Sequence, residues 1–328
     1  MDPTQRTTLG SSDVSVTRFG VGLAGIGSLY RPVSEAEGVA VVDRAWERGI
    51  RLFDTAPLYG FGDSERRAGL ALGRRPRAEF VLSTKVGRLL VPGASRPGDM
   101  WADPPPGVTA RFDFSAAGVR RSVEESLRRL GLDRVDLLHI HDPDEHYGPA
   151  LAQAYPALAE LRKAGVVGAV GVGMNQAAML TRFVRELGDG LDCVMLAGRY
   201  TLLDQSGLAE LLPLCAERGV SVLAAAVYNS GLLADPTGNG RFNYAPAGPA
   251  VLGRALAMQE VCQRYDVPLR AAAVQFPFGH PAVAAVVCGA QSPAEVDDNV
   301  DVFAHPVPGQ LWRDLKAAGL LPAATPTP

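Results

Sequence analysis

The chain has 328 residues, 47% of them hydrophobic, a formal net charge of −3 and no block of basic or acidic residues. This length can bury a large core and suits one large α/β domain or two ordinary ones. The near-neutral charge excludes the electrostatic signature of nucleic-acid-binding and membrane-surface proteins, so we expect a small-molecule partner and neither nucleic acid nor membrane.

Neither a targeting segment nor a metal-ligand motif stands out. Residues 1–10, MDPTQRTTLG, lack the basic start and apolar stretch of a secretory signal, and no apolar run approaches the length of a membrane span. We therefore expect a cytoplasmic protein. The cysteines lie far apart without the spacing of metal ligands, so we expect buried, reduced thiols and no metal site. They are Cys193, Cys215, Cys262 and Cys288.

In chain order, the first predicted element is a hairpin over residues 8–20, with its turn at Ser-Ser-Asp. After it, short apolar runs alternate with longer amphipathic stretches. The apolar runs predict eight strands, at residues 19–24, 51–54, 80–85, 135–141, 166–172, 193–196, 220–226 and 284–288.

Helices are predicted between the strands from the amphipathic stretches and their terminal signals. Ser34 is expected to cap the first helix and Gly49 to end it, and Ser115 and Gly131 do the same for the next. The predicted helices cover residues 34–49, 115–131, 149–164, 176–187, 207–218 and 249–265.

Eight strands alternating with helices predict a (β/α)8 barrel. The strands are almost continuously apolar, as in a parallel sheet covered by helices, and eight units in about 250 residues is the usual size of such a barrel. A doubly wound open sheet is the alternative, but no strand leads into the G-x-G-x-x-G turn that it would use for a dinucleotide. We expect one α/β TIM-barrel domain over residues 1–328, with an N-terminal β-hairpin cap, a long loop over residues 86–114 and an extra C-terminal helix after Pro308.

Three predicted strands end in an ionisable residue, namely Asp54, Lys85 and His141. Side chains alternate along a strand, and catalytic groups of such barrels gather at the C-terminal strand ends, so we expect the three to converge at the barrel mouth. The turn FDTAPLYGFGDSE after the second strand would bring Tyr59 over them. His139, one barrel layer lower, is expected to belong to the core.

These residue types together indicate proton transfer at an oxygen. A tyrosine has a pKa near ~10 and exchanges protons poorly at neutral pH unless a cation stabilises its phenolate. Lys85 can supply that cation, Asp54 can keep it charged, and a neutral His141 can hydrogen-bond a substrate oxygen. Taken singly, Asp54 is an ordinary turn cap, Tyr59 a turn aromatic and Lys85 a snorkelling side chain. Their joint placement favours the functional interpretation.

Three segments resemble the aldo-keto reductase family. GIRLFDTAPLYGFGDSERRAGLAL is similar to the segment with that family's catalytic Asp and Tyr, FVLSTKVG to its catalytic-Lys strand and VDLLHIHDPD to its catalytic-His strand. The resemblance runs from Thr8 to about Asn299 and implies the same (β/α)8 barrel, with a nicotinamide cofactor bound in an extended pose without a Rossmann domain. It implies a catalytic tetrad of Asp54, Tyr59, Lys85 and His141.

The cofactor positions implied by the resemblance depart in part from the family pattern. GVSNF, whose Ser and Asn hold the carboxamide, is here GVGMN, so Gly173 and Met174 replace them and Asn175 is the candidate to take their place. The aromatic that usually stacks on the nicotinamide falls at Ala225. The following YNSGLL matches the pyrophosphate-binding region, although Asn-Ser-Gly is also an ordinary turn. Its candidate residues are Asn229, Ser230, Gly231 and Leu232.

The segment VCGAQSPAEVDDN resembles the adenosine-binding part of the family. In members that bind a 2′-phosphate, a Lys and an Arg clamp it, and the matching positions here are Gly289 and Glu295. A carboxylate repels that phosphate, so we expect NAD in preference to NADP. The cofactor-binding candidates of this segment are Gly289, Gln291, Glu295 and Asn299.

GRYTLLDQ, VYNSGLL and FVLSTKVGRLL together resemble the subgroup that oxidises aldoses such as fucose, galactose or threo-configured sugars at C1, or pyridoxal at its aldehyde carbon. We expect an NAD-dependent aldose dehydrogenase that forms the lactone. Trp101, in the long loop, is expected to be a substrate wall or, equally, a packing anchor.

Alternatives remain within and outside this chemistry. Pyridoxal 4-dehydrogenase and an NADPH-dependent aldehyde or ketone reductase are the alternatives among enzymes, and a nucleotide-sensing barrel without turnover is the alternative among binding modules. A metal-dependent barrel lyase or isomerase is disfavoured, because Asp54 and His141 are the candidate metal ligands at the strand ends and two are too few. No heptad or apolar stripe indicates an interface, so the oligomeric state is left open.

Overall fold

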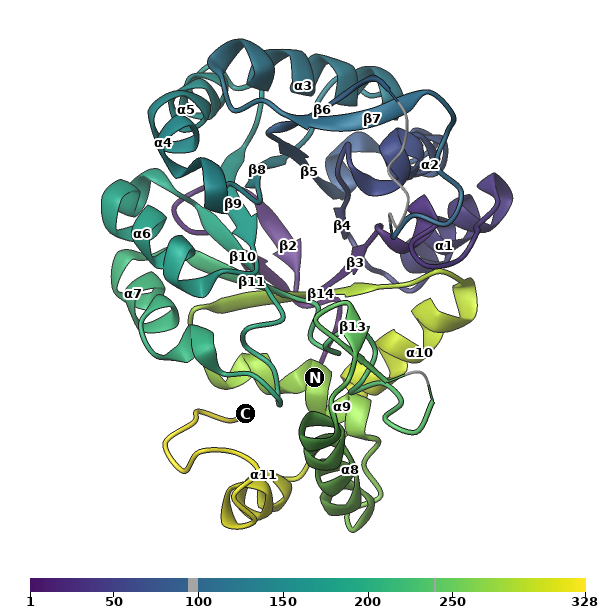
Figure 1. Cartoon of the computed structure of the whole chain (residues 1–328), viewed down its shortest axis with the longest axis vertical. Coiled ribbons are helices and arrows are strands. Elements are labelled where there is room, and N and C mark those ends of the chain that lie inside the picture. The colour runs from purple at the N-terminus through teal and green to yellow at the C-terminus, as the bar shows by residue number, and fades with distance from the viewer. Residues whose placement is uncertain (94–99, 239) are drawn as a thin grey trace.

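The structure of the chain is a computed structural model that describes residues 1–93, 100–238 and 240–328. Eight parallel strands form a closed barrel in sequence order, which confirms the predicted fold and all eight strands and excludes the doubly wound sheet (Figure 1). The barrel strands are β3 (Phe19–Gly22), β4 (Leu52–Asp54), β5 (Val81–Val86), β8 (Leu137–His141), β9 (Ala169–Met174), β10 (Cys193–Ala197), β11 (Ser221–Ala225) and β14 (Val283–Gly289).

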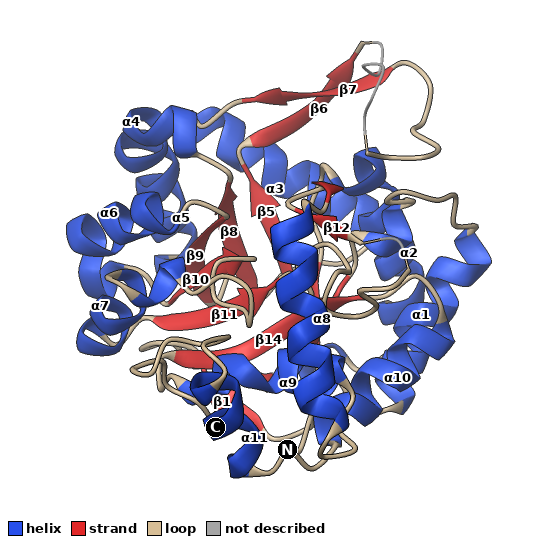
Figure 2. Cartoon of the chain, turned by 60° about the horizontal axis from the view of Figure 1, so that its bottom comes forward, coloured by secondary structure: helices blue, strands red, loops and turns tan. Residues whose placement is uncertain are grey.

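Helices surround the barrel (Figure 2). Apolar residues of the helices and strands form its main hydrophobic core. Ser34 begins the first helix with a capping box to Glu37, and Ser115 accepts the Gly118 N–H at the start of another, both as predicted. The helices are α1 (Glu35–Glu47), α2 (Asp63–Leu72), α3 (Ala116–Leu130), α4 (Tyr147–Pro149), α5 (Tyr155–Lys163), α6 (Ala177–Leu187), α7 (Leu211–Arg218), α8 (Pro249–Gln263), α9 (Leu269–Gln275), α10 (Pro293–Ala304) and α11 (Gly309–Ala317).

The N-terminal hairpin closes one end of the barrel. β1 (Arg6–Thr8) pairs antiparallel with β2 (Ser15–Thr17), as predicted. Leu9, Val14 and Val16 of this hairpin pack against the inward-facing apolar side chains of the barrel strands. This apolar plug fills the N-terminal end of the barrel, and the strand ends that carry Asp54, Lys85 and His141 lie at the opposite, C-terminal end. The predicted C-terminal helix is present as α11, beside α8.

The long loop predicted over residues 86–114 is wrong in part. It contains an antiparallel hairpin of β6 (Arg88–Pro92) and β7 (Val108–Phe112), which extends above the barrel in Figure 2. The high Pro and Gly content concealed two five-residue strands, whose pairing joins positions far apart in sequence. Residues 94–99, within the same predicted loop, lie outside the described residues.

Several other boundaries also differ from the prediction. The helix expected at residues 149–164 is split into α4, a π-helical turn at Ala150–Ala154 and α5. The helix expected from residue 207 begins at Leu211. Helices α2, α9 and α10 were not predicted. The segments of α2 and α10 were interpreted only for their catalytic and cofactor contacts, and the residues of α9 received no assignment. All four cysteines are buried and free, as expected. Among the described residues, no helix has the length and apolarity of a membrane span.

Candidate active site

Three neighbouring barrel strands carry the predicted ionisable residues to the C-terminal end of the barrel. Asp54 ends β4, Lys85 is the next-to-last residue of β5, and His141 ends β8. The parallel register sets Asp54 level with Ser83 and Lys85 level with His139, so the inward side chains stack in layers. Asp54, Lys85 and His141 are only 3%, 2% and 7% exposed, which places charged and polar groups in a water-poor pocket.

The four residues of the implied tetrad lie together. Lys85 Nζ donates to Asp54 Oδ2 at 2.6 Å and to the carbonyl of Thr55 at 2.9 Å. The same nitrogen lies 4.6 Å from the centre of the Tyr59 ring. The rings of His141 and Tyr59 meet edge to face, with centroids 5.8 Å apart. An ammonium and an imidazole therefore flank one phenol.

A strained turn brings Tyr59 over the strand ends. After β4 the chain enters a 3-10 turn at Tyr59–Gly62, in which Gly60, Phe61 and Gly62 have φ of 60°, 50° and 98°. These are left-handed values that glycine adopts without cost and that strain Phe61. A Cβ at Gly60 would lie 2.5 Å from the carbonyl oxygen of Gly27, so the close approach of two backbones also requires glycine there.

Burial dominates the electrostatics of this pocket. Burial raises the pKa of Tyr59 to about 12, although the positive charge of Lys85 acts in the opposite direction. The sequence led us to expect that Lys85 would make the phenol acidic; the direction of its effect is as expected, but loss of solvation outweighs it. Burial also opposes the charge of Lys85, yet the attraction of Asp54 raises the pKa of Lys85 overall. Burial and the Lys85 charge hold the pKa of His141 well below its ordinary value, so this imidazole is neutral.

Trp101 and an ion pair complete the surroundings of the tetrad. The Trp101 ring is 6% exposed and its centroid lies 5.8 Å from that of Tyr59. Arg88, from β6, donates to Asp142 Oδ2 at 2.8 Å, and this oxygen lies 3.5 Å from His141 Nε2. Sequence reasoning missed this pair because Arg88 fell in the predicted loop. The acid after the HIH run was the signal that could have pointed to it.

The loop after β11 contains the first group of cofactor candidates. Asn229 and Ser230 have left-handed φ of 47° and 60°, which strain a non-glycine backbone, and Gly231 follows with φ of 99°, which glycine adopts without strain. Asn229 Nδ2 donates to the carbonyl of Gly198, whereas its Oδ1 is buried without a hydrogen-bond partner among the described residues. Asn175, after β9, donates to the carbonyl of Ala197. Leu232 differs from the others, because its side chain is fully buried in the hydrophobic core.

The second group of candidates lies at the end of β14 and on α10. Gly289 is exposed, and its carbonyl accepts from Asn299 Nδ2 at 3.2 Å. Tyr228, next to Asn229, donates to Asn299 Oδ1 at 3.1 Å, so Asn299 joins the two groups of candidates. Glu295 Oε2 accepts the backbone N–H of Gln291 at 2.8 Å. The structure thus brings both predicted cofactor segments together.

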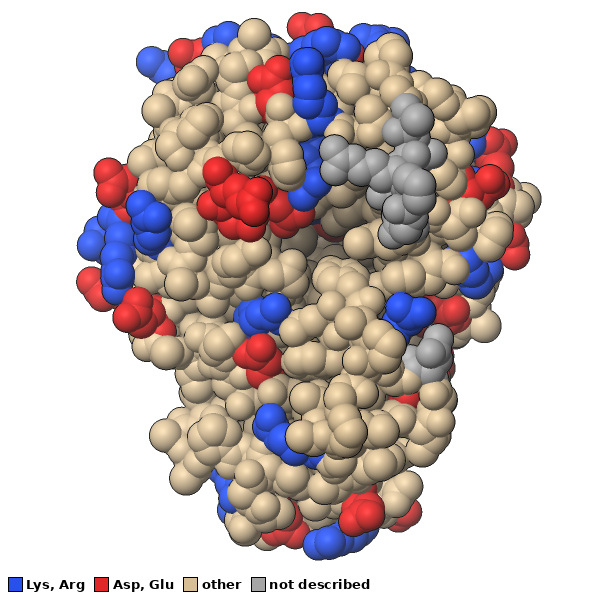
Figure 3. All heavy atoms as spheres, in the orientation of Figure 1, with Lys and Arg blue, Asp and Glu red and all other residues tan. Residues whose placement is uncertain are grey.

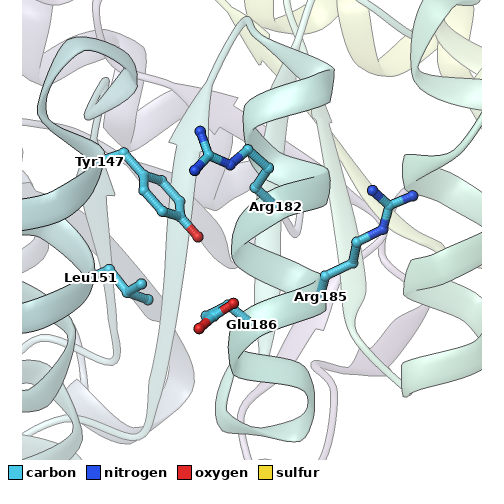
Figure 4. A pocket seen from close by; sticks show the side chains of 5 residues that line it. All are labelled: Tyr147, Leu151, Arg182, Arg185 and Glu186. Carbon is cyan, nitrogen blue, oxygen red and sulfur yellow. The ribbon is translucent and has the colours of Figure 1, made fainter.

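The face seen in Figure 3 is hollowed near its centre, with acidic and basic side chains on the rim. A separate hollow of ≈ 340 Å³ lies on the outer surface between the α4 region and α6 (Figure 4), lined by Tyr147, Leu151, Arg182, Arg185 and Glu186. Arg182 stacks over Tyr147 at 4.1 Å and Arg185 pairs with Glu210 at 3.0 Å, so both cations have partners within the protein. No group of three or more His, Cys, Asp or Glu residues within the described ranges could hold a metal ion.

Known proteins resemble this chain in sequence and in fold. The aldo/keto reductase family model matches residues 18–319. The chain is 44% identical to a D-threo-aldose 1-dehydrogenase from a Pseudomonas species, over 95% of this chain and 97% of the relative. It is 39% identical to a pyridoxal 4-dehydrogenase from Microbacterium luteolum, over 97% of this chain and 98% of the relative. The solved glycerol dehydrogenase from Gluconobacter oxydans shares its fold, with a TM-score of 0.76, 24% identity and coverage of 99% of this chain and 97% of that one. This chain therefore belongs to the aldo/keto reductase family, and it is an NAD(P)-dependent oxidoreductase.

Proposed function

We propose that this protein oxidises an aldose at C1, the anomeric carbon, and forms the lactone with NAD as the hydride acceptor. The observation that carries the proposal is the buried set of a carboxylate, an ammonium, a phenol and a neutral imidazole at the C-terminal end of the barrel. The 44% identity to a D-threo-aldose 1-dehydrogenase supports an aldose as the substrate.

In this proposal Tyr59 exchanges the proton of the reacting oxygen. It accepts the proton of the C1 hydroxyl during oxidation and returns it in the opposite direction. The ammonium of Lys85 stabilises the phenolate form, because its charge counteracts the burial that raises the pKa of Tyr59. Asp54 holds Lys85 charged and in place, and the neutral imidazole of His141 orients the reacting oxygen through a hydrogen bond. The nicotinamide cofactor, when bound, supplies the hydride chemistry.

The loop after β11 fits a dinucleotide. The buried, unpartnered Oδ1 of Asn229 within the described structure is a polar atom that a hydrogen-bond donor of a ligand would satisfy. The left-handed backbone of Asn229, Ser230 and Gly231 is typical of ligand sites. We expect the backbone of residues 229–232 to hold the pyrophosphate and Asn175 to hold the carboxamide.

The adenosine end supports NAD over NADP. Glu295 is fixed by its hydrogen bond from the Gln291 backbone, and its carboxylate would repel a 2′-phosphate at that position. Gly289, where phosphate-binding relatives carry a lysine, is exposed and supplies no cation. We expect kcat/KM with NAD to exceed that with NADP, and the reverse order would overturn this part of the proposal.

Pyridoxal is the second candidate substrate. The Trp101 ring beside Tyr59 is an aromatic wall that suits a flat pyridine ring as well as the apolar face of a sugar. The 39% identity to a pyridoxal 4-dehydrogenase supports this alternative. An NADPH-dependent aldehyde or ketone reductase is the third alternative, and Glu295 disfavours it.

The experiment that tests the proposal is an assay of NAD reduction, followed at 340 nm. The panel contains fucose, galactose, arabinose, threo-configured aldoses and pyridoxal, each with NAD and with NADP. We expect one aldose to give the highest kcat/KM with NAD and the product to be its lactone. Preference for pyridoxal would select the second candidate, and absence of turnover with every compound would refute dehydrogenase activity of this class.

A further inference from the structure

Three further polar side chains form a connected row inside the barrel, beneath Asp54. Ser83, His139 and Cys193 are each 0% exposed. Ser83 Oγ lies 2.9 Å from Asp54 Oδ1 and 3.2 Å from His139 Nδ1. His139 Nε2 lies 3.5 Å from Cys193 Sγ. The row begins in the apolar interior and ends on the carboxylate that binds the Lys85 ammonium.

The direction of each hydrogen bond follows from the charge at the upper end of the row. The Asp54 carboxylate forms an ion pair with the Lys85 ammonium, so its oxygens only accept, and the Ser83 hydroxyl donates to Oδ1. That donation uses the single proton of Ser83, so its oxygen accepts from His139 Nδ1–H. Nε2 of His139 then carries no proton and accepts from the thiol of Cys193.

The environment of the row agrees with these proton positions. Burial and the Lys85 charge lower the pKa of His139 well below its ordinary value, so the imidazole is neutral and carries one proton. Burial raises the pKa of Cys193 well above its ordinary value, so this residue is a thiol with a hydrogen to donate. Each group therefore has one proton, and each proton is directed toward Asp54.

Gly171 makes the row possible. His139 on β8 and Cys193 on β10 are separated by β9, and Gly171 stands between them in the register. A Cβ at Gly171 would lie 2.5 Å from the backbone oxygen of Cys193, 2.9 Å from His139 Cδ2 and 3.0 Å from Cys193 Sγ. Only a residue without a side chain leaves space for His139 to reach across to Cys193.

We propose that Ser83 and His139 are positioning residues, which hold the Asp54 carboxylate in the orientation that keeps the Lys85 ammonium beside Tyr59. The two carboxylate oxygens are used separately, because Lys85 binds Oδ2 and the row binds Oδ1. Neither Ser83 nor His139 touches the substrate or cofactor in this mechanism. The inference rests on the proposed function, in which Tyr59 and Lys85 carry out the proton transfer.

The first test is the Ser83→Ala variant, assayed in the direction of oxidation. We expect kcat/KM to fall about tenfold, because the variant loses a hydrogen bond to a charged group. We also expect the pH profile to move to higher pH, because a less firmly held ammonium stabilises the Tyr59 phenolate less. Ser122→Ala is the matched control. Ser122, on α3, is 1% exposed and its hydroxyl has no hydrogen-bond partner in the described part of the chain, so its loss should leave activity unchanged.

Substitutions of His139 separate positioning from packing. His139→Leu fills the space without a donor and should reproduce the loss and the pH displacement of Ser83→Ala. His139→Asn carries an amide N–H close to the position of Nδ1–H and should recover most of the activity. Equal loss in both variants, with an unchanged pH profile, would overturn the proposal and leave His139 as a packing residue. Circular dichroism and the Tm establish that each variant is folded.

Two further measurements test the proposal independently of how far kcat/KM falls in the single variants. In an Asp54→Asn background, Ser83→Ala should cost no additional activity, because the row acts only through the carboxylate. A full additional tenfold loss would contradict the proposal. In the wild-type protein without substrate, the imidazole ¹⁵N resonances of His139 should show the Nδ1–H tautomer. The Nε2–H tautomer would overturn the proposed hydrogen-bond directions of the row, even if the enzyme is active. The Nδ1–H tautomer in a protein without turnover would leave the row intact and refute only the proposed function.

Discussion

Replacing Lys85 with methionine removes the charge beside Tyr59 while keeping an unbranched side chain of similar length. The ammonium lies 4.6 Å from the centre of the Tyr59 ring. At an effective dielectric constant of ~20, a unit positive charge at about that distance stabilises the Tyr59 phenolate by about 3–4 kcal/mol. This stabilisation lowers the pKa of Tyr59 by about two to three pH units relative to a site without the charge. We therefore expect the pH profile of aldose oxidation by Lys85→Met to move up by about that amount, and kcat/KM at pH 8 to fall about 100- to 1,000-fold.

The assay is kcat/KM for NAD reduction between pH 6 and 11, together with unfolding in urea. Removing one member of the buried Lys85–Asp54 pair should also lower the free energy of unfolding by about 3–5 kcal/mol. The double variant Lys85→Met with Asp54→Asn removes both charges, so it should regain much of that stability and none of the activity. A folded Lys85→Met enzyme with the wild-type pH profile would refute the assigned role of the ammonium.

Three other predictions concern the cofactor, the substrate wall and the buried histidines. Gly289→Lys with Glu295→Arg should raise the NADP-to-NAD ratio of kcat/KM by about 10- to 100-fold. A side chain fits at position 289, because within the described ranges its Cβ would meet a single backbone oxygen, at 4.0 Å. An unchanged ratio would contradict the proposed adenosine contact. Trp101→Ala should raise KM for the aldose about 3- to 10-fold and leave KM for NAD unchanged; the opposite pattern would place Trp101 against the cofactor. The free energy of unfolding should decrease as the pH falls below about 6.5, because the unfolded chain takes up protons on His139 and His141 and the folded protein does not. Each histidine should contribute up to about 1.4 kcal/mol per pH unit. His139→Asn should remove one of these two contributions in an acid series of urea titrations, and an identical slope would show that His139 is not buried neutral.

The approach of Asp54, Lys85 and His141 was predictable from the sequence. Strand side chains alternate faces, and the parallel strands of a barrel end at the same rim. Inward-facing residues at the ends of neighbouring strands therefore lie close together. The capping signals at Ser34 and Ser115 were also sufficient, because a cap acts within one turn of its own helix.

Features that depend on long-range pairing were not predictable. The β6–β7 hairpin needs residues 88–92 to find residues 108–112, and its Pro- and Gly-rich sequence carries only a weak strand signal. The Arg88–Asp142 ion pair depends on that hairpin. His139 was correctly expected in the core, but its contact with Cys193 needed the register of three strands and the gap at Gly171. Whether the pKa of Tyr59 is raised or lowered overall depends on how deeply the phenol is buried, and the sequence does not give that depth.

The role of Tyr59 as the proton-transfer group is tested most directly by the Tyr59→Phe variant with NAD and its preferred aldose. The measurement is kcat, paired with the Kd for NAD from the quenching of tryptophan fluorescence. We expect kcat to fall about 100- to 10,000-fold while the Kd changes by less than about twofold, because the phenol acts on the substrate oxygen and not in cofactor binding. A Tyr59→Phe enzyme with near-normal kcat would contradict the account.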